Sequence, residues 1–132
     1  MLNGFDKQTE PLTDYERNIL LPVIAKGLSL RVGARRAVRN KEIVNAMQRA
    51  GYDLNEARLR KVINHIRCNG CVKCLVATSK GYYVATSPDE VVSYITSLGG
   101  REGAIRAVRE ALERQLDEWI EYINQNNHHH NV

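Results

Sequence analysis

The chain has 132 residues, with 43% hydrophobic and 26% charged residues, which fits one globular domain. This length and composition exclude a multi-domain enzyme with separate lobes and a disordered or collagen-like chain. No apolar run reaches the roughly 18 residues that span a bilayer, and residues 1–13 are polar rather than signal-like. We therefore expect a soluble, cytoplasmic protein.

The net charge of +4 hides a strong segregation of charge along the chain. Residues 26–80 carry thirteen Lys or Arg and three acids, a balance of +10, whereas residues 1–25 carry −2 and residues 81–132 carry −4. A basic middle third between acidic ends is typical of a surface that meets a polyanion, most often nucleic acid. A solvated basic face without a partner is the alternative.

After a flexible segment over residues 1–12, a first helix is predicted to begin at Thr13, because Thr13 and Glu16 form a capping box. Pro22 lacks an amide hydrogen and should kink or divide this helix, which ends between Gly27 and Leu30. Its expected buried stripe consists of Ile19, Leu20, Val23 and Ile24.

Two short helices should follow a basic connector over residues 31–39, whose last part, 37–39, can pair as a short strand. Asn40 is the expected cap of the helix over 41–50, and Gly51 closes it in a left-handed conformation. Asn55 caps the next helix, which runs to about Arg67. Two short helices joined by a tight turn predict a helix-turn-helix unit. The expected apolar contacts are Ile43, Met47 and Ala50 on one face, and Leu54 against Leu59.

A hairpin is predicted after Asn69-Gly70, with strands over 71–77 and 82–86 joined by residues 78–81. The order helix, short strand, helix, helix, hairpin is that of a winged helix. The predicted fold is therefore mainly α with a small β-hairpin, a winged helix-turn-helix domain over residues 13–98 followed by a long C-terminal amphipathic helix.

The C-terminal region should begin at Ser87-Pro88-Asp89-Glu90, which supplies a cap, a first-turn proline and a capping-box glutamate. Val91, Ile95 and Leu98 form its expected buried stripe, and Gly99-Gly100 should interrupt the helix. The continuation over residues 99–123 carries a dimerisation stripe, and residues 124–132 should be disordered. The predicted dimerisation residues are Ile105, Val108, Leu112, Leu116, Trp119, Ile120 and Ile123.

The third helix carries the candidate DNA-reading face. Its core side is predicted to be Leu59, Val62, Ile63 and Ile66. Opposite these, Ala57, Lys61, Asn64 and Cys68 should point outward, with Arg58, Arg60 and His65 on the flanks and Arg67 near the core edge. Arg and Lys donate to guanine and Asn pairs with adenine in the major groove, while lysines elsewhere bind phosphates. The predicted DNA-binding residues are Arg58, Arg60, Lys61, Asn64, His65, Arg67, Lys41, Lys73 and Lys80.

Three stretches resemble the winged-helix DNA-binding proteins of bacterial phages and mobile elements: LTDYERNILLPVIAKGLS, NEARLRKVINHIR and ATSKGYYVATSPDEVVSYI. The likeness covers about Leu12 to Tyr122. It implies that residues 55–67 form a recognition helix, that Ser79-Lys80-Gly81 is the wing tip, and that the protein binds double-stranded DNA in a bacterial host cell. The resemblance implies fold and DNA binding more than a defined role, and we expect a non-enzymatic protein that acts in transcription or replication of a phage or mobile element. The cysteines near Asn69 depart from the family pattern, where apolar residues are usual.

His65, Cys68, Cys71 and Cys74 follow an H-x2-C-x2-C-x2-C spacing whose ligand types suit zinc or an iron-sulfur cluster. Their division between a helix and a strand argues against convergence, so we expect free thiols, no metal and no cofactor. No phosphate-binding loop and no catalytic constellation is apparent.

The terminal helix carries more apolar residues than one small domain needs, which favours a homodimer through parallel or antiparallel helices. Glu102 and Arg109 interrupt a strict heptad seam. One alternative is a monomer whose helix folds back at Gly99-Gly100. A second is a protein-interaction adaptor that binds a phage or host protein through this helix without nucleic acid. RNA binding is disfavoured because aromatic platforms are sparse.

Overall fold

The computed structural model describes residues 10–130. The predicted flexible segment over residues 1–12 falls mostly outside the described residues, and so do the last two residues of the predicted tail. Leu12 is buried in the core, so the folded domain begins before the predicted boundary at Thr13. Of the described helices, none is long and apolar enough to cross a membrane.

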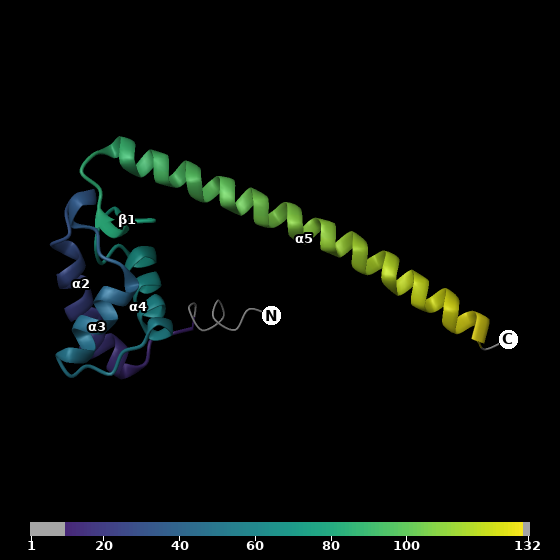
Figure 1. Cartoon of the computed structure of the whole chain (residues 1–132), viewed down its shortest axis with the longest axis horizontal. Coiled ribbons are helices and arrows are strands. Elements are labelled where there is room, and N and C mark those ends of the chain that lie inside the picture. The colour runs from purple at the N-terminus through teal and green to yellow at the C-terminus, as the bar shows by residue number, and fades with distance from the viewer. Residues whose placement is uncertain (1–9, 131–132) are drawn as a thin grey trace. The chain divides into compact units, whose positions relative to one another are not determined.

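Helices and one hairpin make up the described chain. A π-helical turn, η1 (Glu16–Leu20), leads into α2 (Leu21–Ser29), and a 3-10 turn, η2 (Ala34–Arg36), precedes α3 (Asn40–Arg49) and α4 (Glu56–Asn69). Strands β1 (Leu75–Thr78) and β2 (Gly81–Val84) form the hairpin, and α5 (Pro88–His130) ends the described part. Helices α2, α3 and α4 lie together with the hairpin (Figure 1).

The start of the first helix confirms the predicted capping box. The Thr13 amide donates to Glu16 Oε1 at 2.9 Å, and the Glu16 amide donates to Thr13 Oγ1 at 3.2 Å. The helix changes from π to α geometry just before Pro22, because proline cannot donate to the preceding turn. The predicted stripe is only half right: Ile19 and Val23 are exposed, and the buried positions recur every four residues at Glu16, Leu20, Ile24 and Leu28.

The helix-turn-helix unit forms as predicted, with one cap misplaced. Arg39 rather than Asn40 precedes α3, and the Arg39 amide donates to Glu42 Oε1 at 3.0 Å. Asn40 lies in the first turn, where its Oδ1 is buried without a hydrogen-bond partner among the described residues. Gly51 takes the expected left-handed conformation, with φ of 92°. The buried side chains of α3 are Val44 and Met47, whereas Ala50 is exposed.

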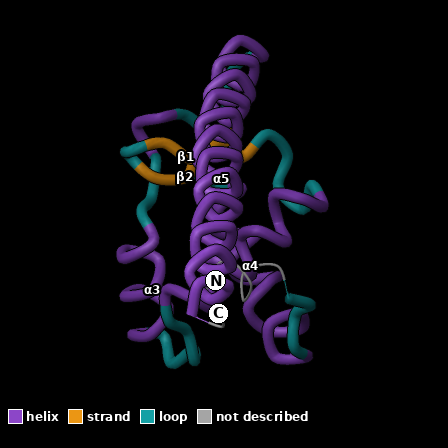
Figure 2. Tube along the Cα trace, turned by 90° about the vertical axis from the view of Figure 1, so that its right-hand side faces the viewer, coloured by secondary structure: helices purple, strands orange, loops and turns teal. Residues whose placement is uncertain are grey.

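The hairpin is shorter than predicted, and its two strands run antiparallel side by side (Figure 2) with Leu75 opposite Val84 and Thr78 opposite Gly81. The segment that precedes β1 is a loop rather than strand. The predicted short strand is confirmed as a bridge, because Val38 and Tyr82 exchange backbone hydrogen bonds of 3.0 and 2.8 Å. Gly81 is required there, since it has φ of 118° and a Cβ would lie 2.4 Å from the Val38 carbonyl oxygen.

The core of the domain is shared by α2, α3, α4 and the hairpin, so the described fold is a winged helix-turn-helix followed by a long helix, as predicted. Its largest fully buried side chains lie on the first and third helices. They are Leu20, Leu59, Val62, Ile63 and Ile66. The predicted core side of α4 is thereby confirmed.

The long helix α5 differs from its prediction in three respects. It is continuous through Gly99-Gly100, although each glycine costs about 1 kcal/mol relative to alanine in a helix interior. Ile95 and Leu98 are exposed rather than buried, and the compact domain ends at Val91. The helix also extends to His130, where we expected a disordered tail.

Ser87 and Glu90 begin α5 almost as expected. The Glu90 amide donates to Ser87 Oγ at 3.4 Å, and the Glu90 carboxylate accepts from the Thr86 amide at 2.7 Å. The predicted helix start is therefore confirmed, and the carboxylate also binds the residue before the cap.

Candidate nucleic-acid interface

The position of α4 is set at both of its ends by local hydrogen bonds. Asn55 Oδ1 accepts from the Arg58 amide at 2.8 Å, as predicted, and Gly70 ends the helix in a left-handed conformation. The buried side of α4 packs against α2, α3 and η1. The opposite side therefore faces away from the core, which is the arrangement that a recognition helix requires.

Two of the predicted DNA-binding cations belong instead to a buried ion-pair cluster around Glu16. This carboxylate is 3% exposed as a residue and contacts Lys61 Nζ at 2.7 Å and Arg58 Nε at 2.9 Å. The Lys61 side chain is only 11% exposed, so the prediction that it points outward is wrong. The physical reason is that a buried carboxylate needs compensating charge, and α4 supplies it from the side facing η1.

Arg58 contacts three residues through its guanidinium. Besides Glu16, it contacts Asp53 Oδ2 at 3.1 Å, and its guanidinium carbon lies 5.1 Å from the centre of the Tyr15 ring. Tyr15 also accepts a hydrogen bond from the Asp53 amide at 2.9 Å. Arg58 therefore joins the first helix, the turn and α4, and we regard it as a positioning residue rather than a reader of bases.

The electrostatics of this cluster are dominated by Glu16. Burial alone raises the pKa of this carboxyl, but hydrogen bonds from Lys61, the Thr13 amide and Arg58 outweigh burial and lower its pKa to about 2. The hydrogen bond to Glu16 raises the pKa of Arg58 above its ordinary value. The cluster is thus fully charged at neutral pH, and it fixes the angle between η1 and α4.

A smaller set of side chains remains on the outer side of α4. At about 100° per residue, Arg60, Asn64 and Arg67 fall within about 60° of one another, at steps of four and three residues. Arg60 is exposed and pairs loosely with Glu56, at 3.8 Å, whereas Asn64 and Arg67 are half-buried. We call these three residues the reading stripe. His65 lies about 100° around the helix from Asn64, on the side that faces the Glu16 cluster.

The predicted phosphate-binding lysines are exposed and lie on different elements, with Lys41 in the first turn of α3. Lys80 lies in the two-residue turn of the hairpin, as predicted, where its amide donates to Thr78 Oγ1 at 3.1 Å. Lys73 precedes β1 instead of lying on it, and its Nζ is close to Gly70 at the end of α4. Lys41 lines a shallow depression together with Glu56 and the hairpin turn. The starts of α3 and α4 therefore lie beside the wing.

The connector before α3 supplies cations that we did not include among the predicted DNA-binding residues. Its backbone follows β2, with Val32 paired to Val84 and Val38 paired to Tyr82. The basic run RVGARRAVR was the signal that could have identified it. Its exposed arginines are Arg31, Arg35, Arg36 and Arg39.

The cysteines do not form a metal centre in the described residues. Cys68, Cys71 and Cys74 are free and exposed, and no three His, Cys, Asp or Glu side chains in that part of the chain come together as ligands. Cys74 has φ of 54°, which turns the loop into β1. The spacing that included His65 therefore does not produce a site there.

The predicted dimerisation residues are all exposed on α5. The apolar side chains from Ile105 to Ile123 range from 40% exposed at Ile123 to 69% at Ile105. Such a continuous exposed stripe is typical of an interaction surface.

No protein-family model matches the chain, and comparison with curated proteins and with solved structures finds no match either.

Proposed function

We propose that this protein binds double-stranded DNA, with α4 in the major groove and the wing on the phosphate backbone, and that α5 joins two copies. The observation that carries the proposal is the reading stripe, Arg60, Asn64 and Arg67, on the outer side of a helix held rigidly by the Glu16 cluster. The wing beside it carries Lys80. The exposed arginines of the connector add positive charge along the same hairpin.

Each part of this surface has a distinct chemical task. The two arginines of the reading stripe donate to guanine O6 and N7, and the Asn64 amide pairs with the N6 and N7 edge of adenine. Lys41, Lys73 and Lys80 bind phosphates, which sets register without reading sequence. Arg60 must exchange its exposed contact with Glu56 for the base, and an exposed pair of this kind is worth less than about 1 kcal/mol.

The test compares Asn64→Ala with Lys80→Ala on a site selected by the wild-type protein and on random duplex. Asn64→Ala should cost about 1–3 kcal/mol on the selected site and relax the choice of base at one position, whereas Lys80→Ala should weaken binding to both duplexes alike. Lys26→Ala, an exposed lysine on α2, is the matched control and should change neither affinity. Equal losses for Asn64→Ala on both duplexes would exclude base reading.

The biological role that we propose is transcription control or replication initiation in a phage or mobile element. The resemblance of ATSKGYYVATSPDEVVSYI to the winged-helix proteins of such elements supports it. A sequence selected from random DNA by the protein should then recur in the promoter or origin of its own element.

A protein-interaction adaptor is the second candidate, and the exposed apolar stripe of α5 favours it. In that case a pull-down would recover a partner that depends on Trp119 and Ile123, and the protein would show no affinity for nucleic acid.

A further inference from the structure

The stripe on α5 has a regular spacing. Its six main positions follow each other at steps of three, four, four, three and four residues, and at about 100° per residue they occupy only about 80° of the helix circumference. One shallow hollow lies along it, lined by apolar side chains and the flanking Arg109 and Glu113. The six positions are Ile105, Val108, Leu112, Leu116, Trp119 and Ile123.

This stripe is self-complementary when it is reversed about Leu112. Val108 and Leu116 lie four residues before and after Leu112, and Ile105 and Trp119 lie seven before and after. We propose that a second copy of the chain packs antiparallel on α5, with the two-fold axis at the level of Leu112. The proposal deepens the dimer of the proposed function and does not depend on DNA binding.

Trp119 is the largest side chain of the stripe and has a matching hollow in this arrangement. A knob enters the hole formed by positions i, i+3, i+4 and i+7 of the facing helix. Reversal about Leu112 brings Trp119 to the level of residue 105, at the centre of the hole formed by Arg101, Ala104, Ile105 and Val108. Ala104 leaves room for the indole ring.

Arg101 becomes a favourable part of this hole rather than an interruption of the stripe. Its guanidinium carbon lies 6.0 Å from the ring centre of Tyr94 on the same helix, so the side chain already lies against an aromatic surface. Opposite a second copy, the same guanidinium meets the indole of Trp119, where a cation–π contact is favourable.

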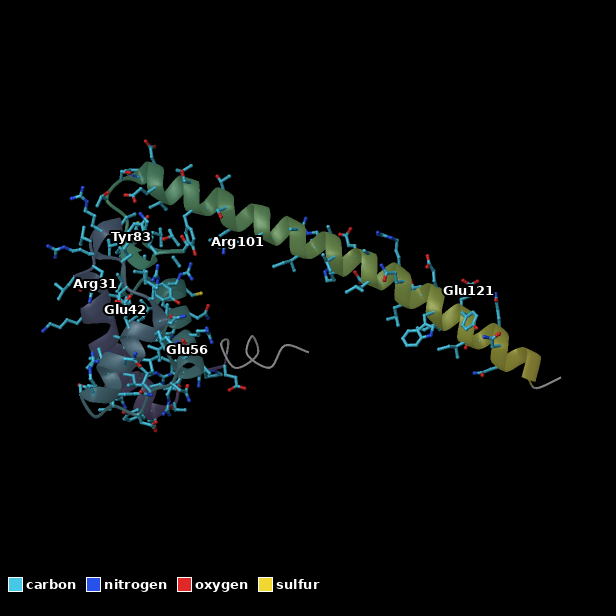
Figure 3. All side chains as sticks on the ribbon, viewed as in Figure 1. Arg31, Glu42, Glu56, Tyr83, Arg101 and Glu121 are labelled. Atoms are coloured by element: carbon cyan, nitrogen blue, oxygen red, sulfur yellow. The ribbon has the colours of Figure 1, made fainter. Side chains whose placement is uncertain are left out.

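The charges beside the stripe also favour antiparallel pairing. Arg109 and Glu113 lie on the same flank, about 60° and 100° from Leu112, and are joined by a contact of 2.9 Å. Because they straddle Leu112, reversal brings Arg109 of each copy to within two residues of the level of Glu113 of the other, so each arginine lies near an acidic side chain of both copies. Arg101 and Glu121 lie in different halves of α5 (Figure 3).

Parallel pairing in register lacks these features. It would set Trp119 against Trp119, and Arg101 against Arg101 inside an apolar seam, where like charges repel. The observations therefore favour the antiparallel dimer.

Disulfide cross-linking distinguishes the two orientations in a background with Cys68, Cys71 and Cys74 replaced by Ser. A mixture of Val108→Cys and Leu116→Cys chains should form a mixed cross-linked dimer, and Val108→Cys alone should form none. Leu112→Cys alone should cross-link, because this residue meets its own copy at the axis. Cross-linking of Val108→Cys alone would show parallel helices and overturn the proposal, and so would no cross-link by Leu112→Cys.

Trp119→Ala tests the knob separately, by sedimentation velocity without DNA. It should weaken dimerisation at least about tenfold, as truncation of a central aromatic anchor does. Val92→Ala, an exposed apolar residue about 160° away from Leu112 on the same helix, is the matched control and should have no effect. A monomer at all concentrations in the wild type would overturn the dimer while leaving DNA binding by the domain untouched.

Discussion

Glu16 serves the fold at two levels, as the capping residue of its own helix and as the counter-ion of α4. Its carboxylate accepts from the Thr13 amide and from Lys61 and Arg58 at the same time. The capping role follows from a local pattern of residues three apart. The counter-ion role depends on residues more than forty positions away, so no local pattern announces it, and it removes two cations from the predicted reading face.

The first prediction concerns Glu16→Gln, which keeps the shape of the side chain but leaves Lys61 and Arg58 without their buried counter-charge. A pKa lowered from 4.5 to about 2 corresponds to roughly 3 kcal/mol of unfolding free energy at neutral pH. Because the folded-state pKa is the lower one, this stability is present above about pH 4.5 and is lost as pH falls toward 2. Urea unfolding at several pH values measures it.

The exposed Glu10→Gln is the matched control for this prediction and should change stability little. The difference in unfolding free energy between wild type and Glu16→Gln should become smaller as pH falls from 4.5 toward 2. A difference in unfolding free energy that stays constant down to pH 2 would contradict the stabilising role of the cluster. A loss of unfolding free energy no larger than that of Glu10→Gln would contradict it too.

Among the elements, α5 shows that glycine alone does not determine where a helix is interrupted. No atom lies within 4 Å of a Cβ added at Gly99 or Gly100, so these two glycines are not required by packing within the described structure. The helix nevertheless continues through both of them. The hinge that the monomeric alternative needs is therefore not found at this position.

The second prediction concerns the stability of α5 when these two glycines are replaced by alanine. Gly99→Ala and Gly100→Ala should each stabilise α5 by about 1 kcal/mol, because alanine loses less backbone entropy in a helix. Helicity followed by far-UV circular dichroism during thermal unfolding measures the change. Gly81→Ala is the contrasting control and should destabilise the hairpin, since its Cβ would meet the Val38 carbonyl. Loss of helicity in Gly99→Ala would contradict the continuous helix, because alanine favours a helical backbone more than glycine does.

Most helix starts could be predicted because their signals are local. Thr13 with Glu16, Asn55 and Ser87 each cap within three residues, and the core side of α4 follows from helical periodicity alone. Burial could not be predicted where it depends on what packs from elsewhere. The same periodicity predicts that Lys61 points outward, yet the neighbouring η1 covers it.

For the whole molecule, the segregated charge and the exposed stripe of α5 are the bases of two separate proposals, DNA binding and dimerisation. The basic middle third supplies the cations of the domain, and the acidic C-terminal third supplies α5. In the proposed antiparallel dimer, the Pro88 residues at which the two α5 helices begin lie about 72 Å apart along the pair. This distance is twice the length from Pro88 to Leu112 at about 1.5 Å per residue.

The measurement that tests DNA binding most directly is fluorescence anisotropy of a random duplex of about 30 base pairs, titrated at several salt concentrations. The account predicts that log affinity falls linearly with log salt, by about 0.9 for each phosphate contact, and that Lys41, Lys73 and Lys80 replaced together by Ala lower the slope by about 3. Absence of binding even at low salt would contradict the account and favour the protein-interaction adaptor.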